Sequence, residues 1–348
     1  SMDVLDVDWN IPSEYPDLTK CKQLAVDLET RDPNIKTLGP GWSRKDGNII
    51  GIAVAGGDYK GYFPIRHENG HNLDPEMTLN WFKDQMNTPH IDKVMHNATY
   101  DAGWLRAEGI DVKGRIIDTM VAAPLIDENR FSYSLNNLGR DFIDMRKDEK
   151  MLKAAAKDFG IDPKSDMYKM PPMYVGPYAE QDALMTLKLW ERLNIEINRN
   201  ELNSVFELES RLIPILLDMR ERGVRVDLDK AEKAREKLKK RVKEIKSFIK
   251  KKTSIDIEPW ANASVEKVFK ELGLNYPKTD LGAPSFTKQF LQAHPNEVAQ
   301  AIVKLREADK ADSTFIDSIL KHEHKGRIHC EFHQLRSDDG GTVTGRFS

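Results

Sequence analysis

The segment that decides the fold is Gln23 to Thr30, Gln-Leu-Ala-Val-Asp-Leu-Glu-Thr, an apolar run that ends with two carboxylates one residue apart. The run predicts a buried strand. Because successive strand side chains point to opposite faces, we expect Asp27 and Glu29 to share one face while Leu28 turns into the core. Two carboxylates on one face repel each other unless cations neutralise them. Taken alone, the segment predicts either a metal site or the commoner alternative, a strand end exposed to water.

Two further acidic motifs lie downstream. The segment from His96 to Asp101 follows a second apolar run and has the spacing Asn-x-x-x-Asp. The segment from Tyr178 to Asp182 opens a helical pattern and has the spacing Tyr-x-x-x-Asp. Since residues four apart lie on one face of a helix, the phenol and the carboxylate of this third motif can converge on one site. The three motifs together favour a composite acidic site that none of them predicts alone.

In this order the motifs resemble Exo I, Exo II and Exo III of the DEDDy 3′-to-5′ exonucleases, as in the proofreading domain of family A (Pol I-like) DNA polymerases. The resemblance implies a ribonuclease-H-like α/β domain with a mixed sheet, which removes nucleotides from the 3′ end of DNA. It also implies two divalent ions, Mg²⁺ or Mn²⁺, a choice that oxygen ligands favour over zinc. The implied metal ligands are Asp27, Glu29, Asp101 and Asp182. Tyr178 and Glu29 would orient the attacking water, and Asn97 would contact the DNA.

Length and composition set the broad class. The chain has 348 residues, 39% of them hydrophobic and 31% charged, which is typical of an ordinary globular protein of two domains. No apolar run approaches the ~20 residues that a membrane span needs, and the acidic N-terminus is unlike a signal peptide. Cys21 and Cys330 are too few for a disulfide framework. We therefore expect no membrane partner and a cytoplasmic location, in the host cytoplasm if the protein is phage-encoded.

The net charge of −3 conceals a strongly basic segment. Between Lys230 and Lys252 there are twelve basic residues and three acidic ones. Such an excess can contact DNA phosphates, and Lys237, Lys240 and Lys251 are our candidates for these contacts. The alternative is that the lysines form the solvated face of a helix.

Hydrophobic periodicity predicts the remaining elements of the first half. We expect strands at 48–55, 59–65, 93–97 and 116–120, and helices at 76–86, 100–108, 132–142, 148–159 and 177–197. That order predicts an α/β layer with a mixed sheet. Asp118, at the end of the last strand, also resembles a family position, but we leave it out of the metal set. The expected domains are an irregular lead-in at 1–21, the exonuclease domain at 22–199 and a mainly α-helical, thumb-like domain at 200–348.

The second half resembles the start of a family A polymerase domain, mainly its thumb. An apolar stripe from Val205 to Met219 and another from Ala231 to Ile249 predict two helices, which we expect to pack together. The resemblance rests on the segments 219–227, 278–285 and 344–348. The last of these resembles the Thr-Gly-Arg-Leu-Ser motif, in which Arg346 would approach the primer-template backbone.

The chain ends before the positions where the catalytic acids of a polymerase palm would follow. We therefore expect no polymerisation by this chain alone, and we expect the rest of the polymerase, palm and fingers, as a partner alongside primer-template DNA and a single-stranded 3′ end. A polymerase of bacteriophage type fits best. Two alternatives stay open: an RNA-trimming exonuclease of the RNase D type, which shares the same acids, and a non-catalytic DNA-binding fragment.

Overall fold

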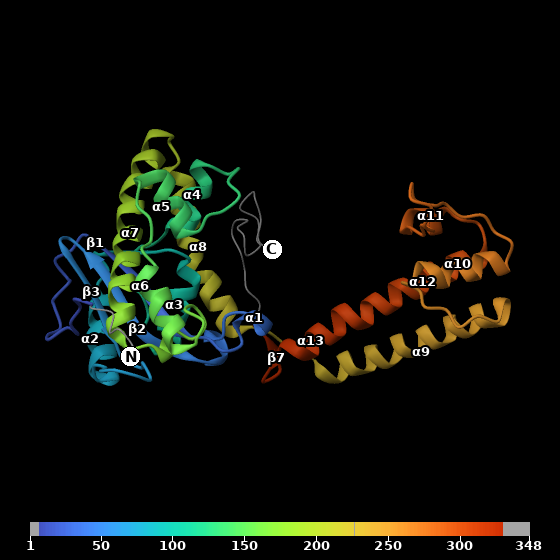
Figure 1. Cartoon of the computed structure of the whole chain (residues 1–348), viewed down its shortest axis with the longest axis horizontal. Helices are drawn as coiled ribbons and strands as arrows, with labels where there is room; N and C mark the ends of the chain where they lie inside the picture. The colour runs from blue at the N-terminus through green and yellow to red at the C-terminus, as the bar shows by residue number, and fades with distance from the viewer. Residues whose placement is uncertain (1–6, 226, 330–348) are drawn as a thin grey trace. The chain divides into compact units, whose positions relative to one another are not determined.

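The computed structural model describes residues 7–225 and 227–329 of the chain, and these form two compact units. The first unit comprises the described residues up to Gly223 together with His329, and the second runs from Val224 to Ile328 (Figure 1). The expected boundaries of the lead-in and of the exonuclease domain, after residues 21 and 199, remain predictions.

The first unit is built on a five-stranded sheet in the order β3-β2-β1-β4-β5. Its strands are β1 (Gln23–Arg31), β2 (Asn48–Gly56), β3 (Tyr59–Pro64), β4 (Asp92–Met95) and β5 (Ile116–Asp118). β1 pairs antiparallel with β2 and parallel with β4, while β2–β3 is antiparallel and β4–β5 parallel. The mixed sheet predicted from the order of the elements is therefore confirmed, with the segment that decides the fold at its centre.

Helices surround this sheet. They are α1 (Ile35–Leu38), α2 (Pro75–Met86), α3 (Ala98–Ala107), α4 (Thr119–Ile126), α5 (Leu135–Ile143), α6 (Lys150–Phe159), α7 (Pro172–Arg199) and α8 (Asn203–Arg222), with 3-10 turns at Trp42–Arg44 and Met167–Lys169. Periodicity did not predict α4, because this helix begins directly where β5 ends. Asp118 closes the strand and caps the helix, since its side chain accepts a hydrogen bond from the Met120 N–H.

Two apolar cores lie on opposite faces of the sheet. Ala25 of β1 belongs to the core formed with α4, α5, α6 and α7. Leu24, Val26 and Leu28 belong to the other core, formed with α2, α3 and α8. The alternation predicted for β1 is confirmed, and it follows that Asp27 and Glu29 lie on the face covered by α7 (Figure 1).

The lead-in has no helix or strand over residues 7–22, yet it packs on the rest of the first unit. Leu18 is 2% exposed. The Trp9 Nε1–H donates to Glu180 Oε1 at 2.9 Å, and a Cβ added to Gly176 would lie 2.3 Å from the Trp9 ring. The tryptophan therefore rests on α7, on the turn of helix that leads to Tyr178.

The apolar stripe predicted for α8 is wrong. The structure buries Phe206, Ile213, Leu216 and Leu217 of this helix, and leaves Leu208 61% exposed. The helix carries two apolar rows that are offset by about one residue, and their spacing alone does not show which row is buried. The sheet of the first unit determines which of the two rows faces the core.

The second unit is mainly helical, as predicted. It comprises α9 (Leu228–Thr253), α10 (Asn262–Glu271), α11 (Lys288–Ala293), α12 (Glu297–Lys310), a π-helical turn (Ala311–Ile316), α13 (Asp317–His322) and three two-residue strands, β6 (Val224–Arg225), β7 (Glu323–His324) and β8 (Arg327–Ile328). α9 lies beside α12, and Val242, Ile245 and Ile249 contribute to the core between them (Figure 1). The packing of α9 against α8, which belongs to the first unit, stays a prediction. Within the described residues, no helix combines the length and the apolar character that crossing a membrane requires.

Gly51 of β2 gives a first testable prediction. It pairs with Glu29 across the sheet, and a Cβ added to it would lie 1.9 Å from the hydroxyl of the fully buried Tyr62. That hydroxyl is held by His67 Nε2 at 2.6 Å, so the ring has little freedom to move. We expect Gly51→Ala to lower the free energy of unfolding by about 1–3 kcal/mol. Urea unfolding measures this, and an unchanged midpoint would contradict the crowding.

Candidate active site

Strand β1 supplies the first two acids of the site. Asp27 lies opposite Ala53 and Glu29 opposite Gly51 on the neighbouring strand, and the Tyr62 hydroxyl fills the side-chain position at Gly51. The register shifts between Glu29 and Thr30, so the strand has an irregularity directly after the second acid and then pairs on to Arg31. Both side chains are partly buried and face α7.

Helix α7 supplies the third acid and the tyrosine. Asp182 is 5% exposed, and Tyr178 lies one turn before it on the same helix. One ligand oxygen from each of Asp27, Glu29 and Asp182 can be chosen so that all three lie within 4.8 Å of one another. The structure therefore brings together acids that are 155 residues apart in the sequence (182 − 27).

Asp101 of α3 lies next to this group of three. It is 4% exposed, and its pKa is raised well above the ordinary value by burial, by Asp27 and by Asp118, while a backbone hydrogen bond from Leu28 opposes the shift. The charge of Asp101 also raises the pKa of Glu29, so Asp101 interacts electrostatically with the cluster. Its oxygens are not part of the close group of three, which places it at the side of the site.

Asp118 fixes the position of Asp101, a role that the sequence analysis missed. Its carboxylate accepts hydrogen bonds from the N–H groups of Asn97, Ala98 and Met120, each at 2.9 Å. It thereby holds the first turn of α3 and the left-handed conformation of Asn97, whose φ is 70°. An Asp at the end of a strand and directly before a helix is a capping signal that could have indicated this.

The electrostatics of the site favour a divalent cation. Burial, and then the charge of Asp182, raises the pKa of Asp27 to about 8. Burial and the neighbouring acids raise the pKa of Glu29 well above its usual range. Asp182 Oδ1 is buried and has no hydrogen-bond partner among the residues that the structure describes. Clustered carboxylate oxygens, one of them without a hydrogen-bond partner, are the donor set that Mg²⁺ and Mn²⁺ prefer, so the residues present fit such ions.

Two further side chains complete the surroundings of the acids. The pKa of Tyr178 is raised by burial and by Asp182, Glu29 and Asp27, so its hydroxyl stays protonated and can donate a hydrogen bond. Lys147 pairs with Asp182, its Nζ lying 3.3 Å from Oδ2. No sequence motif marks Lys147, because it lies in a loop and meets the acids only through the fold.

The predicted DNA-binding residues lie in different parts of the chain. Asn97 caps α3 in the first unit. Lys237, Lys240 and Lys251 are exposed on α9 in the second unit. Arg346 lies outside the described residues. Their contacts with DNA remain predictions.

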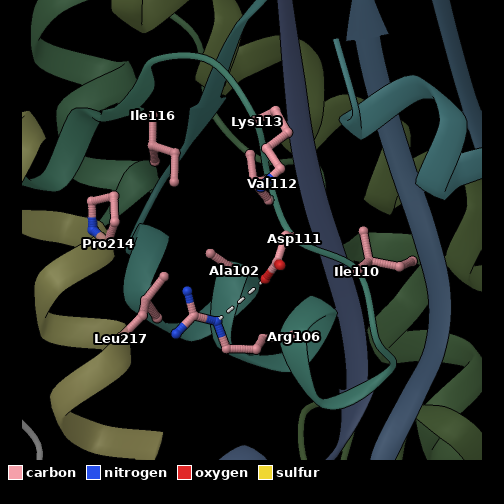
Figure 2. Close-up of a pocket in the computed structure, with 9 residues that line it drawn as sticks. All are labelled: Ala102, Arg106, Ile110, Asp111, Val112, Lys113, Ile116, Pro214 and Leu217. Atoms are coloured by element: carbon pink, nitrogen blue, oxygen red, sulfur yellow. Dashed lines mark ion pairs between the residues drawn. The ribbon is translucent and has the colours of Figure 1, made fainter. Parts of the chain in front are cut away.

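A small cleft between α3, α8 and the loop at 110–116 lies apart from the acidic motifs. It holds about 170 Å³ and is lined by Ala102, Arg106, Ile110, Asp111, Val112, Lys113, Ile116, Pro214 and Leu217 (Figure 2). Arg106 points across it to Asp111, with Nε and Oδ1 3.7 Å apart, and also pairs with Asp218 and Glu221 of α8. Its lining includes none of the predicted metal ligands. The cleft is therefore separate from the acidic site, and the ion pairs of Arg106 lie along it.

Comparison with known proteins identifies the family. The family described as 3′-5′ exonuclease, within the family A DNA polymerases, matches residues 15–198. The DNA-directed DNA polymerase of Pseudomonas phage M6 is 36% identical over 358 residues, which cover 98% of this chain and 54% of that polymerase. DNA polymerase DpoZ of Acinetobacter phage SH-Ab 15497 is 30% identical over 362 residues, which cover 96% of this chain and 55% of DpoZ. The chain thus spans about half the length of these relatives.

A solved structure shares the fold. The POL domain of Pol1 from M. smegmatis, in a complex with DNA primer-template and dNTP, superposes with a TM-score of 0.70 at 19% identity over 95% of this chain and 51% of that one. The match of residues 15–198 and the identity to phage polymerases agree with the motifs of β1, α3 and α7. The chain therefore belongs to the family A DNA polymerase-related proteins and contains their 3′-5′ exonuclease domain.

Proposed function

We propose that this chain hydrolyses the phosphodiester at the 3′ end of DNA and releases a nucleoside monophosphate. The observation that carries this proposal is the group of Asp27, Glu29 and Asp182, in which one ligand oxygen from each acid lies within 4.8 Å of the other two. Carboxylates gathered in this way, with pKa values raised by burial and mutual repulsion, serve catalysis more often than stability.

The acids have separate tasks in this proposal. Asp27, Glu29 and Asp182 hold divalent cations, and Asp101 assists from beside Asp27. When bound, two such ions supply a water of lowered pKa and neutralise the charge that develops on the leaving 3′ oxygen. By fixing the carboxylates before substrate arrives, β1 and α7 avoid reorganisation during the reaction.

Tyr178 and Glu29 orient the attacking water. The tyrosine is the donor, because its raised pKa keeps the hydroxyl protonated at neutral pH. Glu29, on strand β1, is the acceptor. A donor and an acceptor from two rigid elements restrict the water to one direction of approach, which is the geometric requirement of an in-line displacement.

DNA is the substrate that the comparisons favour. The relatives are named as DNA polymerases, and their alignments extend through the basic second unit. Since the chain spans about half of these relatives, we propose that a palm and fingers part, and primer-template DNA, are its partners.

Labelled single-stranded DNA and RNA, each incubated with the protein in Mg²⁺ or in EDTA, test the proposal. Shortening of DNA from its 3′ end in Mg²⁺ alone supports it. Shortening of RNA in preference to DNA would favour an enzyme of the RNase D type. Binding of DNA without any metal-dependent shortening would favour a DNA-binding fragment and overturn the proposal.

The exposed lysines of α9 provide a separate prediction about binding. Each lysine that neutralises a phosphate contributes about one unit to the slope of log affinity against log salt. Changing Lys237, Lys240 and Lys251 together to Gln is therefore expected to weaken primer-template binding at low salt and to flatten that slope by about three units. Fluorescence anisotropy across a salt series measures the slope.

The control for this experiment is a triple Gln variant with the same change of charge on the first unit. Its positions are the exposed lysines Lys83, Lys153 and Lys157. Equal effects in both variants would show a general dependence on net charge, and α9 would then carry only a solvated face.

A further inference from the structure

Lys147 is a charged side chain at the acidic cluster that none of the three exonuclease motifs includes. Its Nζ lies 3.3 Å from Asp182 Oδ2 and 5.5 Å from the centroid of the Tyr178 ring. The lysine side chain is only 18% exposed and that of the aspartate 7%. Burying a lysine ammonium is costly unless a carboxylate compensates its charge. The contact with Asp182 is therefore a buried ion pair of the site rather than a surface ion pair.

The loop that carries Lys147 is fixed on both sides of this residue. It connects α5 to α6 and includes Arg146 and Asp148. The Gln181 amide Nε2 donates to the Arg146 carbonyl at 3.2 Å, and the Asp148 N–H donates to Gln181 Oε1 at 3.3 Å. The Lys147 N–H itself donates to Asn136 Oδ1 at 3.1 Å.

One helix therefore organises the acid, the tyrosine and the lysine. Gln181 directly precedes Asp182 in α7, and Tyr178 lies in the same turn. The helix that brings Asp182 to the cluster thus also holds the loop from which Lys147 reaches that acid.

The lysine acts on the whole cluster. It opposes the rise in the pKa of Asp27, Glu29 and Asp182. Its ammonium lies 3.3 Å from Asp182 Oδ2, and an ammonium in contact with a carboxylate is held in its charged form. The cluster therefore contains a permanent cation supplied by the chain.

We propose that Lys147 is a positioning residue of the exonuclease site: it holds Asp182 by Oδ2, leaves the unpartnered Oδ1 for a divalent cation, and limits how strongly the acids bind that cation. This inference rests on the proposed function, because it assumes that the acids bind metal. A fixed ammonium repels a divalent ion at the same carboxylate. The affinity of the site for a divalent cation is therefore lower than the acids alone would give. Weaker binding favours exchange of ions and products over permanent occupancy.

The test is the affinity of the intact chain for Mn²⁺ alone, measured by isothermal titration calorimetry and by the rise of Tm with Mn²⁺ concentration. Lys147→Met keeps an unbranched side chain, one atom shorter, and removes its charge. We expect it to bind Mn²⁺ at least about tenfold more tightly, since the repulsion of a monovalent and a divalent cation in contact with one carboxylate is of that order even with the screening of bulk water. In EDTA the same variant should have a lower Tm, because the acids lose their counter-charge.

Two controls separate charge from structure. Lys147→Arg keeps the charge and is expected to retain an affinity within about threefold of the wild type. Lys153→Met removes an ammonium that is 64% exposed and pairs with Glu149 at 3.0 Å, and should leave Mn²⁺ affinity unchanged. If Lys147→Met does not fold, Gln181→Met provides the second variant, since it frees the loop without altering charge and should also tighten Mn²⁺ binding.

The outcomes distinguish this inference from the proposed function. If the wild-type chain does not bind Mn²⁺, the metal site itself is refuted. If the wild type binds and Lys147→Met binds equally or more weakly, the acids form a metal site but Lys147 does not limit it, and the inference is overturned. Unchanged binding by a folded Gln181→Met variant, where Lys147→Met cannot be purified, overturns it as well.

Discussion

Replacing Asp27 with Ala is expected to reduce shortening of a labelled DNA strand to the level that remains in EDTA, and Asp182→Ala is expected to do the same. Each change removes a carboxylate from the only group of three whose ligand oxygens lie within 4.8 Å of one another in the described part of the chain. The acids that remain offer too few ligands to hold and orient the ions that the reaction needs. Circular dichroism should show an intact fold. Asp84→Ala, at an exposed position of α2, is the matched control and should retain full activity.

The two acids should differ in their effect on stability. Asp27→Asn removes a carboxyl whose pKa is raised to about 8 in the folded chain, a shift that makes the fold less stable at neutral pH, so Tm in EDTA should rise. Asp182→Asn removes the partner of Lys147 and leaves a buried ammonium without its ion pair, so Tm in EDTA should fall. Changes of the same sign in both variants would contradict the arrangement of charges described for the site.

Tyr178→Phe is expected to slow DNA shortening by roughly ten- to a thousandfold while leaving the affinity for Mn²⁺ nearly unchanged. The hydroxyl contributes a hydrogen bond to the attacking water, whereas the carboxylates hold the ions. Single-turnover rates at saturating Mn²⁺ measure the loss, and calorimetry checks the affinity.

Phenylalanine has the same ring as tyrosine, so this change tests the hydroxyl alone. The ring stays against Lys147, and only the hydroxyl is lost. Wild-type rates at saturating metal would remove Tyr178 from the reaction, while a large loss of Mn²⁺ affinity would assign it to the metal site.

Much of the site could be predicted from the sequence because its acids lie on regular elements. The period of two in β1 places Asp27 and Glu29 on one face, and the spacing of four in α7 places Tyr178 beside Asp182. Each of these relations depends on local backbone geometry alone. The mixed sheet followed from the order of strands and helices for the same reason.

The parts that could not be predicted depend on contacts between distant segments. Lys147 reaches Asp182 from a loop, and its position is set by hydrogen bonds to Gln181 that no periodicity reveals. Asp118 was noticed as a family position but not as the cap that holds α3. For α8, the choice between two apolar rows was made by the sheet, which buries Ile213 and exposes Leu208.

The packing of Trp9 on α7 sets a practical limit for anyone who isolates the exonuclease. A fragment that started at the first strand would lose the indole that covers Gly176 and the hydrogen bond to Glu180, both within the turns of α7 around Tyr178. Such a fragment would expose apolar surface on the helix that carries the tyrosine, and low activity in it would report on the trimming rather than on the chemistry. The shortest fragment suited to kinetic work therefore begins upstream of Trp9.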